Sequence, residues 1–470
     1  MDDGDRSWRD LLADGRLPRF ALICLGVWLN AADSLVTATI MPSVGASLGG
    51  YAYFSWTIAG FMVGAIMAGA SAGRFAEVFG LRQATAVAGL VFAGGCVAGA
   101  MAPTMPVFVA GRIVQGLGSG WISGFAMVAI AVLFPARHLA RVFAAVAGVW
   151  GIATVVGPLV GGLFAAAGDW RAVFWLFAGQ AVLFSIAAPF LLKSDVAPDH
   201  APGIPWGQLG VLSFGVTAIA VADITRMPLL AGALVVGGLA ILALVFRLDR
   251  GSRVRLLPHR AGDLRTVVGT GYLAIFASTA AAMPITVYGP AILQQLRGLT
   301  PIEAGYAIAA EACMWTVMAF AVSGAVSGSS ADRAWIRRGA LCIFIGVAML
   351  ALVTRSAPLA LVCIAAGMMG AGFGLSTAFT NQRIMSALAD EDRAIGSSAL
   401  IAVRQTGGAV GAAIAGVAAN VVGFGTGLTD ATASAAAVWV FVPAIPLALA
   451  ALWASWRLTG GAIAPVRAAA

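Results

Sequence analysis

The chain has few charged residues. Asp, Glu, Lys and Arg together make up 10% of its 470 residues, whereas a soluble domain averages about 25%. Hydrophobic residues make up 60% of the chain, and its mean hydropathy is +0.94. This composition excludes an ordinary soluble domain and favours a protein that crosses a lipid bilayer several times.

The residues needed for ATP hydrolysis, metal binding and hydrolytic catalysis are also scarce. The single lysine, Lys193, follows Leu192 instead of glycine, so the chain has no Walker A phosphate loop. The five cysteines form no C-x-x-C pair and the three histidines fall in expected loops, so we expect no metal site and no cofactor. A G-x-S-x-G pattern at Ser71 ends an apolar segment and has no histidine partner, so we expect no enzyme activity.

Apolar segments of about 20 residues, the length of a membrane span, recur along the whole chain. With the N-terminus in the cytoplasm, 22 of the 28 Lys and Arg residues lie in cytoplasmic segments, which predicts cytoplasmic termini in a plasma (inner) membrane. The net charge of +8 is spread over short loops and indicates no nucleic-acid partner. We expect fourteen transmembrane helices, which start near Phe20, Phe54, Ala84, Val107, Phe143, Val173, Trp206, Pro228, Thr266, Ala304, Arg338, Pro358, Ile395 and Ala435.

Two loop segments repeat between the halves of the chain. The segment from Gly69 aligns without gaps with the segment from Gly324, and each follows the second helix of a six-helix set. A repeat of the same orientation predicts an all-α membrane protein built from two related six-helix bundles plus two inserted helices. The expected divisions are a cytoplasmic segment (1–19), a first bundle (20–193), a linker with two extra helices and a basic cytoplasmic loop (194–265), a second bundle (266–457) and a cytoplasmic tail (458–470).

Several motifs resemble those of the major facilitator superfamily, and more narrowly those of its fourteen-helix branch of drug/proton antiporters. The matching stretches are GRFAEVFGLR (73–82), GRIVQGLGSG (111–120), GPLVGG (157–162) with DWRAVFW (169–175), VRQTGGAVGAAIAG (403–416) and the apolar stretch 26–42 around Asp33. The resemblance implies a transporter that alternates between inward-facing and outward-facing states. It also implies that small-molecule export is coupled to protons.

Three of the charged residues within apolar segments are the expected proton-coupling residues: Asp33, Arg112 and Glu311. Asp33 lies about 20 Å into its helix, too deep for its short side chain to reach either surface. Burial penalises its charged form, so we expect reversible protonation. Arg112 lies at a compatible depth and is expected to modulate the proton affinity of Asp33. The alternatives are an Asp33 that only forms structural hydrogen bonds and an Arg112 that only fixes helix packing.

Glu311 shares a helix face with Met314, Trp315 and Met318. An acid beside an aromatic ring and thioethers suits a lipophilic cation, and a second proton site is the other functional interpretation of Glu311. A face that only packs against a neighbouring helix is the alternative. The expected substrate cavity adds to this face the polar residues Asn30, Thr37, Gln115, Asn381, Gln382, Arg404 and Gln405.

Glycines, a proline and loop charges form the expected moving parts. Glycines let helices approach closely, and proline can bend a helix. The loop charges are expected to pair in one state and to separate in the other. The expected gating residues are Gly73, Glu77, Gly80, Arg82, Gly157, Pro158, Gly161, Gly162, Gly328, Asp332, Arg333 and Arg337.

The sequence therefore predicts a proton-coupled exporter of lipophilic or cationic small molecules, of the multidrug-efflux type. Its expected partners are the small-molecule substrate, protons and the lipid bilayer. A monomer is expected, with the oligomeric state left open. Two alternatives remain: a proton-coupled exporter of a lipid, siderophore or metabolite, and a membrane scaffold or receptor without transport.

Overall fold

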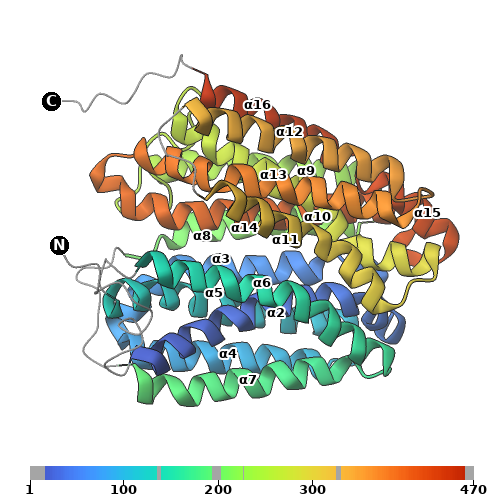
Figure 1. Ribbon diagram of the computed structural model, residues 1–470, viewed down its shortest axis with the longest axis horizontal. Coiled ribbons are helices and arrows are strands. Elements are labelled where there is room, and N and C mark those ends of the chain that lie inside the picture. The colour runs from blue at the N-terminus through green and yellow to red at the C-terminus, as the bar shows by residue number, and fades with distance from the viewer. Residues whose placement is uncertain (1–15, 135–138, 193–202, 226, 324–329, 461–470) are drawn as a thin grey trace.

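The computed structural model describes residues 16–134, 139–192, 203–225, 227–323 and 330–460. All regular secondary structure in these ranges is helical (Figure 1). The elements are α2 (Arg16–Leu48), η2 (Tyr51–Tyr53), α3 (Trp56–Phe79), α4 (Leu81–Ala100), α5 (Met105–Leu133), α6 (Leu139–Ala166), α7 (Trp170–Leu191), α8 (Trp206–Asp223), α9 (Pro228–Arg250), α10 (Val267–Arg297), α11 (Pro301–Val322), α12 (Ser330–Val353), α13 (Leu359–Ser386), η4 (Asp390–Asp392), α14 (Arg393–Val421), η5 (Phe424–Thr426), α15 (Asp430–Trp439) and α16 (Ala444–Thr459).

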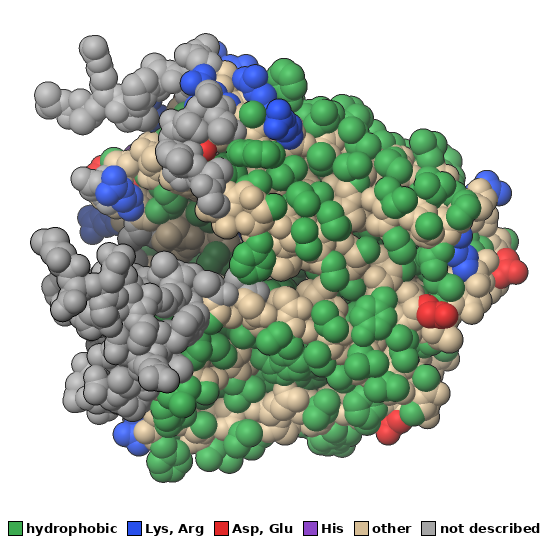
Figure 2. All heavy atoms as spheres, in the orientation of Figure 1, with side chains coloured by type: hydrophobic (Ala, Val, Ile, Leu, Met, Phe, Trp, Pro, Cys, Tyr) green, Lys and Arg blue, Asp and Glu red, His purple; other side chains and the backbone are tan. Residues whose placement is uncertain are grey.

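Fourteen helical segments within the described ranges are long and apolar enough to cross a membrane, as the sequence predicts. Helices satisfy their own backbone hydrogen bonds, which is why apolar segments of this length are stable in lipid. Figure 2 shows hydrophobic side chains over the middle of the visible face and charged side chains towards its two ends. The surface thus carries the apolar band that a bilayer requires.

The last span differs from the single continuous helix that its apolar length suggests. It consists of α15 and α16, with a turn at Val440–Pro443 between them. Pro443 precedes α16 and Pro446 lies in its first turn, and neither residue can donate a backbone hydrogen bond to the preceding turn. Several helices also extend further than expected: α2 begins at Arg16 and α12 at Ser330.

The helices form two halves that lie one against the other (Figure 1). The first half consists of α2–α7 and the second of α10–α16, and the contacts between them join α3 to α14 and both α2 and α6 to α11. The inserted helices α8 and α9 pack on each other, and α8 contacts both α3 and α14. The insert therefore lies beside one of the two seams between the halves.

The two ends of the molecule differ. The start of α2 and the end of α16 lie at one end, here called the termini end, and η2, η5 and α15 lie at the opposite end (Figure 1). The surface between the halves is hollowed at the termini end (Figure 2). On the visible face, the structure is thus hollowed between its halves at the termini end.

The opposite end is closed by an aromatic cluster contributed by both halves. Phe54 follows η2, Tyr288 belongs to α10 and Phe424 begins η5, and none of the three side chains is exposed. Their ring centroids lie 5.0–6.0 Å apart. Aromatic pairs at such distances stabilise packing beyond the area that they bury.

Candidate functional site

Asp33, Arg112 and Gln115 form a buried polar network inside the first half. Asp33 and Gln115 have no exposed surface and Arg112 is 2% exposed. Arg112 Nη1 lies 3.0 Å from Asp33 Oδ1 and 2.8 Å from Oδ2, and Gln115 Nε2 donates to Oδ1 over 2.8 Å. The sequence places Asp33 and Arg112 at compatible depths in the same bundle, and the structure brings the two side chains into contact. It also brings Gln115, expected only in the substrate cavity, into the same network.

Arg112 also connects the network to α3. Its Nε donates to the Thr57 carbonyl over 3.2 Å, and its guanidinium lies 4.5 Å from the centre of the Phe61 ring. A buried arginine needs an anion, carbonyl groups or an aromatic face, and Arg112 has all three. A change in the charge of Asp33 would therefore alter contacts among α2, α3 and α5 together.

Glycines of the GRIVQGLGSG stretch allow α5 to approach its neighbours closely enough to place Arg112. A Cβ at Gly116 would clash with the Phe61 carbonyl of α3, and a Cβ at Gly118 would clash with the backbone of Phe92 on α4. The absence of these side chains fixes the depth at which α5 carries Arg112 and Gln115. Such close packing of small residues is a general means of helix association in membranes.

The glycines and proline of the GPLVGG stretch lie where α6 meets α2 and α11. A Cβ at Gly157 would lie 2.8 Å from Leu35 Cβ, and one at Gly161 would lie 3.0 Å from the Val36 carbonyl oxygen. Gly162 leaves room for Ile302 of α11, and Pro158 packs beside Gly305 of α11. This surface, formed by α2, α6 and α11, is called the glycine seam below, and it joins the two halves towards the opposite end.

Other polar residues of α2 lie near the network. Thr37 Oγ1 lies 3.4 Å from Asp33 Oδ1, which is at the long limit of a hydrogen bond. Asn30 donates to Ser123 of α5 over 2.9 Å. Both residues thus lie on the side of α2 that faces α5.

The face of α11 that carries Glu311 packs against α13. Met314 and Met318 contact the glycine positions 367 and 374 of α13, and the backbone of Glu311 fills the space beside Gly370. Trp315 stacks on Phe373 of α13, with ring centroids 5.0 Å apart and ring planes 15° apart.

The Glu311 carboxylate itself is half-buried and makes no hydrogen bond or ion pair with any residue that the structure describes. Its face therefore combines helix packing with an acid that has no partner.

The remaining cavity candidates fall into two groups. Arg404 of α14 lines a recess in the second half and lies 5.9 Å from the Trp315 ring centre. Gln405 and Asn381 are half-buried and Gln382 is exposed, and none of the three lines this recess. The structure thus brings Arg404 and Trp315 together but not the three amides.

The loop charges at the termini end make local contacts in this structure. Glu77 pairs with Arg74 of its own helix at 2.5 Å. Arg337 donates to Thr459 over 2.7 Å and lies over the Trp456 ring.

The other gating candidates at this end differ in exposure and backbone geometry. Gly73, Gly80 and Arg82 are half-buried, Arg333 is exposed and Asp332 is buried. Gly80 has a φ of 75° in the turn between α3 and α4, which only glycine adopts readily. Gly328 lies outside the described residues.

A second buried acid, Asp223, escaped the sequence analysis. It ends α8, is 2% exposed, and accepts hydrogen bonds from Ser55, which precedes α3, and from Asn420 of α14. Asn420 also donates to the Ala52 carbonyl over 3.0 Å, which joins the two halves directly. Asp223 lies at the very end of an apolar segment, where an acid is usually exposed in a loop. Its burial is therefore visible only in the tertiary structure.

Comparisons with known proteins agree with this architecture. The sequence matches the family profile of the Major Facilitator Superfamily over residues 23–412. A protein of Mycobacterium tuberculosis named as a probable multidrug-efflux transporter is 29% identical over 436 residues, which cover 88% of this chain and 90% of that protein. An MFS-type transporter of the acurin A biosynthesis cluster of Aspergillus aculeatus is 30% identical over 208 residues, which cover 43% of this chain and 37% of that protein.

Solved structures share the fold at low sequence identity. A D-xylose–proton symporter superposes with a TM-score of 0.60 at 17% identity, covering 92% of this chain and 97% of the symporter. A POT family transporter in complex with 5-aminolevulinic acid gives a TM-score of 0.68 at 12% identity, and the superposition covers 95% of this chain and 97% of that transporter. These likenesses concern the fold alone. Together with the family match over most of the chain, they show that this protein is a membrane transporter of the Major Facilitator Superfamily.

Proposed function

We propose that this transporter exports lipophilic small molecules in exchange for protons, and that Asp33 is the residue that carries the proton. The observation that carries the proposal is the fully buried carboxylate of Asp33, in the middle of α2. It accepts hydrogen bonds from Arg112 and Gln115 of α5. Acids in the interior of membrane proteins are costly and mark proton or substrate pathways. The similarity to a probable multidrug-efflux transporter supports export as the direction.

The ion pair offers a physical means of coupling. Arg112 and Gln115 stabilise the charged carboxylate with direct hydrogen bonds. A proton on Asp33 weakens its bonds to Arg112, because charge-assisted hydrogen bonds are the stronger ones. Arg112 is then held chiefly by Thr57 and Phe61 of α3. Protonation would thus loosen α2 from α5.

The glycine seam would carry this change to the second half. Leu35, Val36 and Thr39 follow Asp33 on α2 within two turns and pack against α6, and Thr39 also packs beside Gly305 of α11. A shift of α2 therefore acts directly on the contact between the halves. With the termini in the cytoplasm, the structure is inward-facing: it is hollowed at the termini end and closed at the opposite end (Figure 2).

Proteoliposomes that contain the full chain and an acidic lumen provide the test. The probes are ethidium as a lipophilic cation, 1-naphthoate as a lipophilic acid and 1-naphthamide as its neutral counterpart, and a lumenal dye reports the pH. We expect gradient-dependent uptake of at least one probe together with loss of lumenal protons. Asp33→Asn should abolish both signals, whereas Glu391→Gln, which alters an exposed acid of η4, should leave them unchanged. Equal uptake with and without the gradient would contradict proton coupling.

Export of a metabolite by the same coupling is the second candidate. The observation in its favour is the similarity to a transporter named for a fungal biosynthesis cluster. The similarity covers 43% of this chain and 37% of that protein. The three probes are synthetic aromatic compounds of different charge, so a transporter restricted to one metabolite would move none of them. The scaffold or receptor alternative is not supported by the family match.

A further inference from the structure

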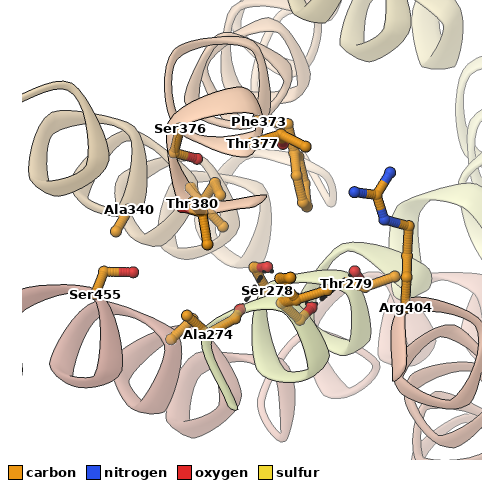
Figure 3. Close-up of a pocket in the computed structure, with 13 residues that line it drawn as sticks. Ala274, Ser278, Thr279, Ala340, Phe373, Ser376, Thr377, Thr380, Arg404 and Ser455 are labelled. Atoms are coloured by element: carbon orange, nitrogen blue, oxygen red, sulfur yellow. Dashed lines mark hydrogen bonds between the residues drawn. The ribbon is translucent and has the colours of Figure 1, made fainter. Parts of the chain in front are cut away.

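A polar recess opens within the second half of the molecule, between α10, α12, α13, α14 and α16 (Figure 3). Its empty volume of about 420 Å³ includes open solvent at its mouth, so the enclosed part suits a small polar group. Hydroxyl groups and one guanidinium supply its polar surface. The polar side chains are Ser278, Thr279, Ser376, Thr377, Thr380, Arg404 and Ser455.

Arg404 is the charged residue of the recess. Its side chain extends from α14 towards Phe373 and Thr377 (Figure 3). Among the residues that the structure describes, Arg404 has no carboxylate or carbonyl partner, and no Asp or Glu lines the recess. Arginine remains charged at any physiological pH, so a guanidinium at this depth needs an anion or water.

Three acids of the helices, Asp33, Asp223 and Glu311, do not pair with Arg404 in the observed state. Asp33 is bound to Arg112 in the first half, and Asp223 is bound to Ser55 and Asn420 at the opposite end. Glu311, on α11 one turn before Trp315, makes no hydrogen bond or ion pair with Arg404. An anion that arrives from outside the protein is therefore the natural partner.

The hydroxyl groups and the aromatic pair define the rest of the ligand. Ser278, Thr279 and Ser376 donate to carbonyls of their own helices and present acceptor oxygens. Thr377, Thr380 and Ser455 make no side-chain hydrogen bond within the described ranges and can donate to a bound anion. The stacked pair of Trp315 and Phe373 lies beside Arg404 and suits an aromatic ring.

We propose that this recess binds the anionic group of an amphiphilic organic acid, with Arg404 on the carboxylate and the Trp315–Phe373 pair on the apolar body. The proposal rests on the proposed export function and deepens it by naming a substrate class. It assigns acids to a transporter whose sequence suggests lipophilic cations. Arginine suits the role because its planar donors match a carboxylate and stack on aromatic rings.

Equilibrium binding to the purified full-length protein tests the proposal without requiring transport. The ligands are 1-naphthoate, 1-naphthamide and 1-naphthylmethylammonium, which share a ring and differ in charge. We expect 1-naphthoate to bind the native protein about tenfold or more tightly than the other two, because charge-assisted hydrogen bonds exceed neutral ones. Equal binding of the acid and the amide would overturn the proposal.

Variants locate the site. Arg404→Gln should weaken 1-naphthoate about tenfold or more and leave 1-naphthamide unchanged, and Arg404→Lys should weaken the acid less. If Arg404→Gln proves unstable, Thr380→Val takes its place. This variant keeps the side-chain shape and should weaken the binding of 1-naphthoate by a few-fold. Arg355→Gln, an exposed arginine in the α12–α13 turn, is the matched control.

Undiminished binding of 1-naphthoate to Arg404→Gln and Thr380→Val would overturn the assignment. It would also be overturned if 1-naphthoate bound the native protein only by displacing an anionic lipid. Because binding is measured at equilibrium, a protein that binds 1-naphthoate through Arg404 but moves no probe would leave this inference intact and contradict the proposed export. A protein that exports ethidium but shows no preference for the acid would give the reverse result.

Discussion

Arg112 and Asp33 form an ion pair that solvent does not reach: Arg112 Nη1 lies 2.8 Å from Asp33 Oδ2, and the two side chains are 2% and 0% exposed. The pair joins α2 to α5 within one half, and Arg112 also bonds to α3. Both α2 and α3 contact the second half, so a change in the pair can reach it through either helix. Breaking such a pair by removing one partner is more damaging than neutralising both.

This asymmetry predicts different outcomes for single and double variants. Asp33→Asn should destabilise the protein by about 3–5 kcal/mol, because it leaves the Arg112 charge buried without its anion. The double variant Asp33→Asn/Arg112→Gln should regain most of that stability and still show no proton-driven transport. Thermal unfolding in detergent and uptake by proteoliposomes measure the two effects separately. A double variant that transports normally would show that the pair serves packing alone.

The glycine seam predicts that one methyl group shifts the equilibrium between states. Gly162→Ala should push α6 away from Ile302 of α11, at a cost of about 1–3 kcal/mol to the closed state. Spin labels at the exposed residues Met101 and Arg355, one in each half at the opposite end, should then show a larger share of long distances by pulsed electron paramagnetic resonance. Native cysteines are replaced by alanine in this background.

Gly151→Ala on the same helix is the matched control for Gly162→Ala, because a Cβ at Gly151 meets no heavy atom within 4 Å. Its distance distribution should equal that of the parent. If both alanine variants behave alike, the seam does not govern closure.

Asp223 predicts that the inserted helix α8 helps to hold the opposite end closed. Asp223→Ala removes the acceptor shared by Ser55 and Asn420 and should cost the closed state about 1–3 kcal/mol. The same pair of spin labels should report a wider separation, and Asp223→Asn should give a smaller change because it keeps one acceptor oxygen. Asp430→Ala removes a bond to Gln295 within the second half and should leave the distance unchanged. An unaltered distance in Asp223→Ala would mean that the aromatic cluster closes this end alone.

Asp392 predicts a pH-dependent contribution to stability at the termini end. Burial raises the pKa of Asp392, but hydrogen bonds from the His259 amide and ring, together with the charge of Arg255, outweigh this effect, so the pKa lies below its usual value. A lowered pKa in the folded state gives stability that is present above the unfolded value of about 3.9 and is lost as the pH falls through the folded value.

Asp392→Asn should therefore lower the free energy of unfolding by about 1 kcal/mol at pH 7 and reduce the loss of stability that the native protein shows in acid. Thermal unfolding between pH 7 and about pH 2 provides the measurement, because the contribution of Asp392 is lost only below the unfolded pKa of about 3.9. Glu391→Gln alters the exposed neighbouring acid and should follow the native curve. Parallel curves for Asp392→Asn and the native protein would show that this acid does not anchor the loop after α9.

Much of the site could be predicted because it depends on the cost of charge in lipid. Asp33 and Arg112 stand out in apolar segments, and the spacing of Gly157, Gly161 and Gly162 indicates close helix contacts. Those signals are local, since hydropathy and spacing are properties of one helix. The partners Thr57 and Phe61 carry no such signal, because an ordinary threonine carbonyl and a phenylalanine ring become ligands only when α3 lies beside α5.

The sequence by itself determined the fourteen apolar helices and the depth of the charged residues, and its repeat predicts the paired six-helix organisation. It could do so because the bilayer imposes length and polarity on each segment separately. Only the tertiary structure decided which charges meet. It paired Arg112 with Asp33, placed Arg404 in a recess without an acid, and buried Asp223 between three helices that lie far apart in the chain. Such pairings depend on how helices pack across the molecule, and no property of a single segment specifies that arrangement.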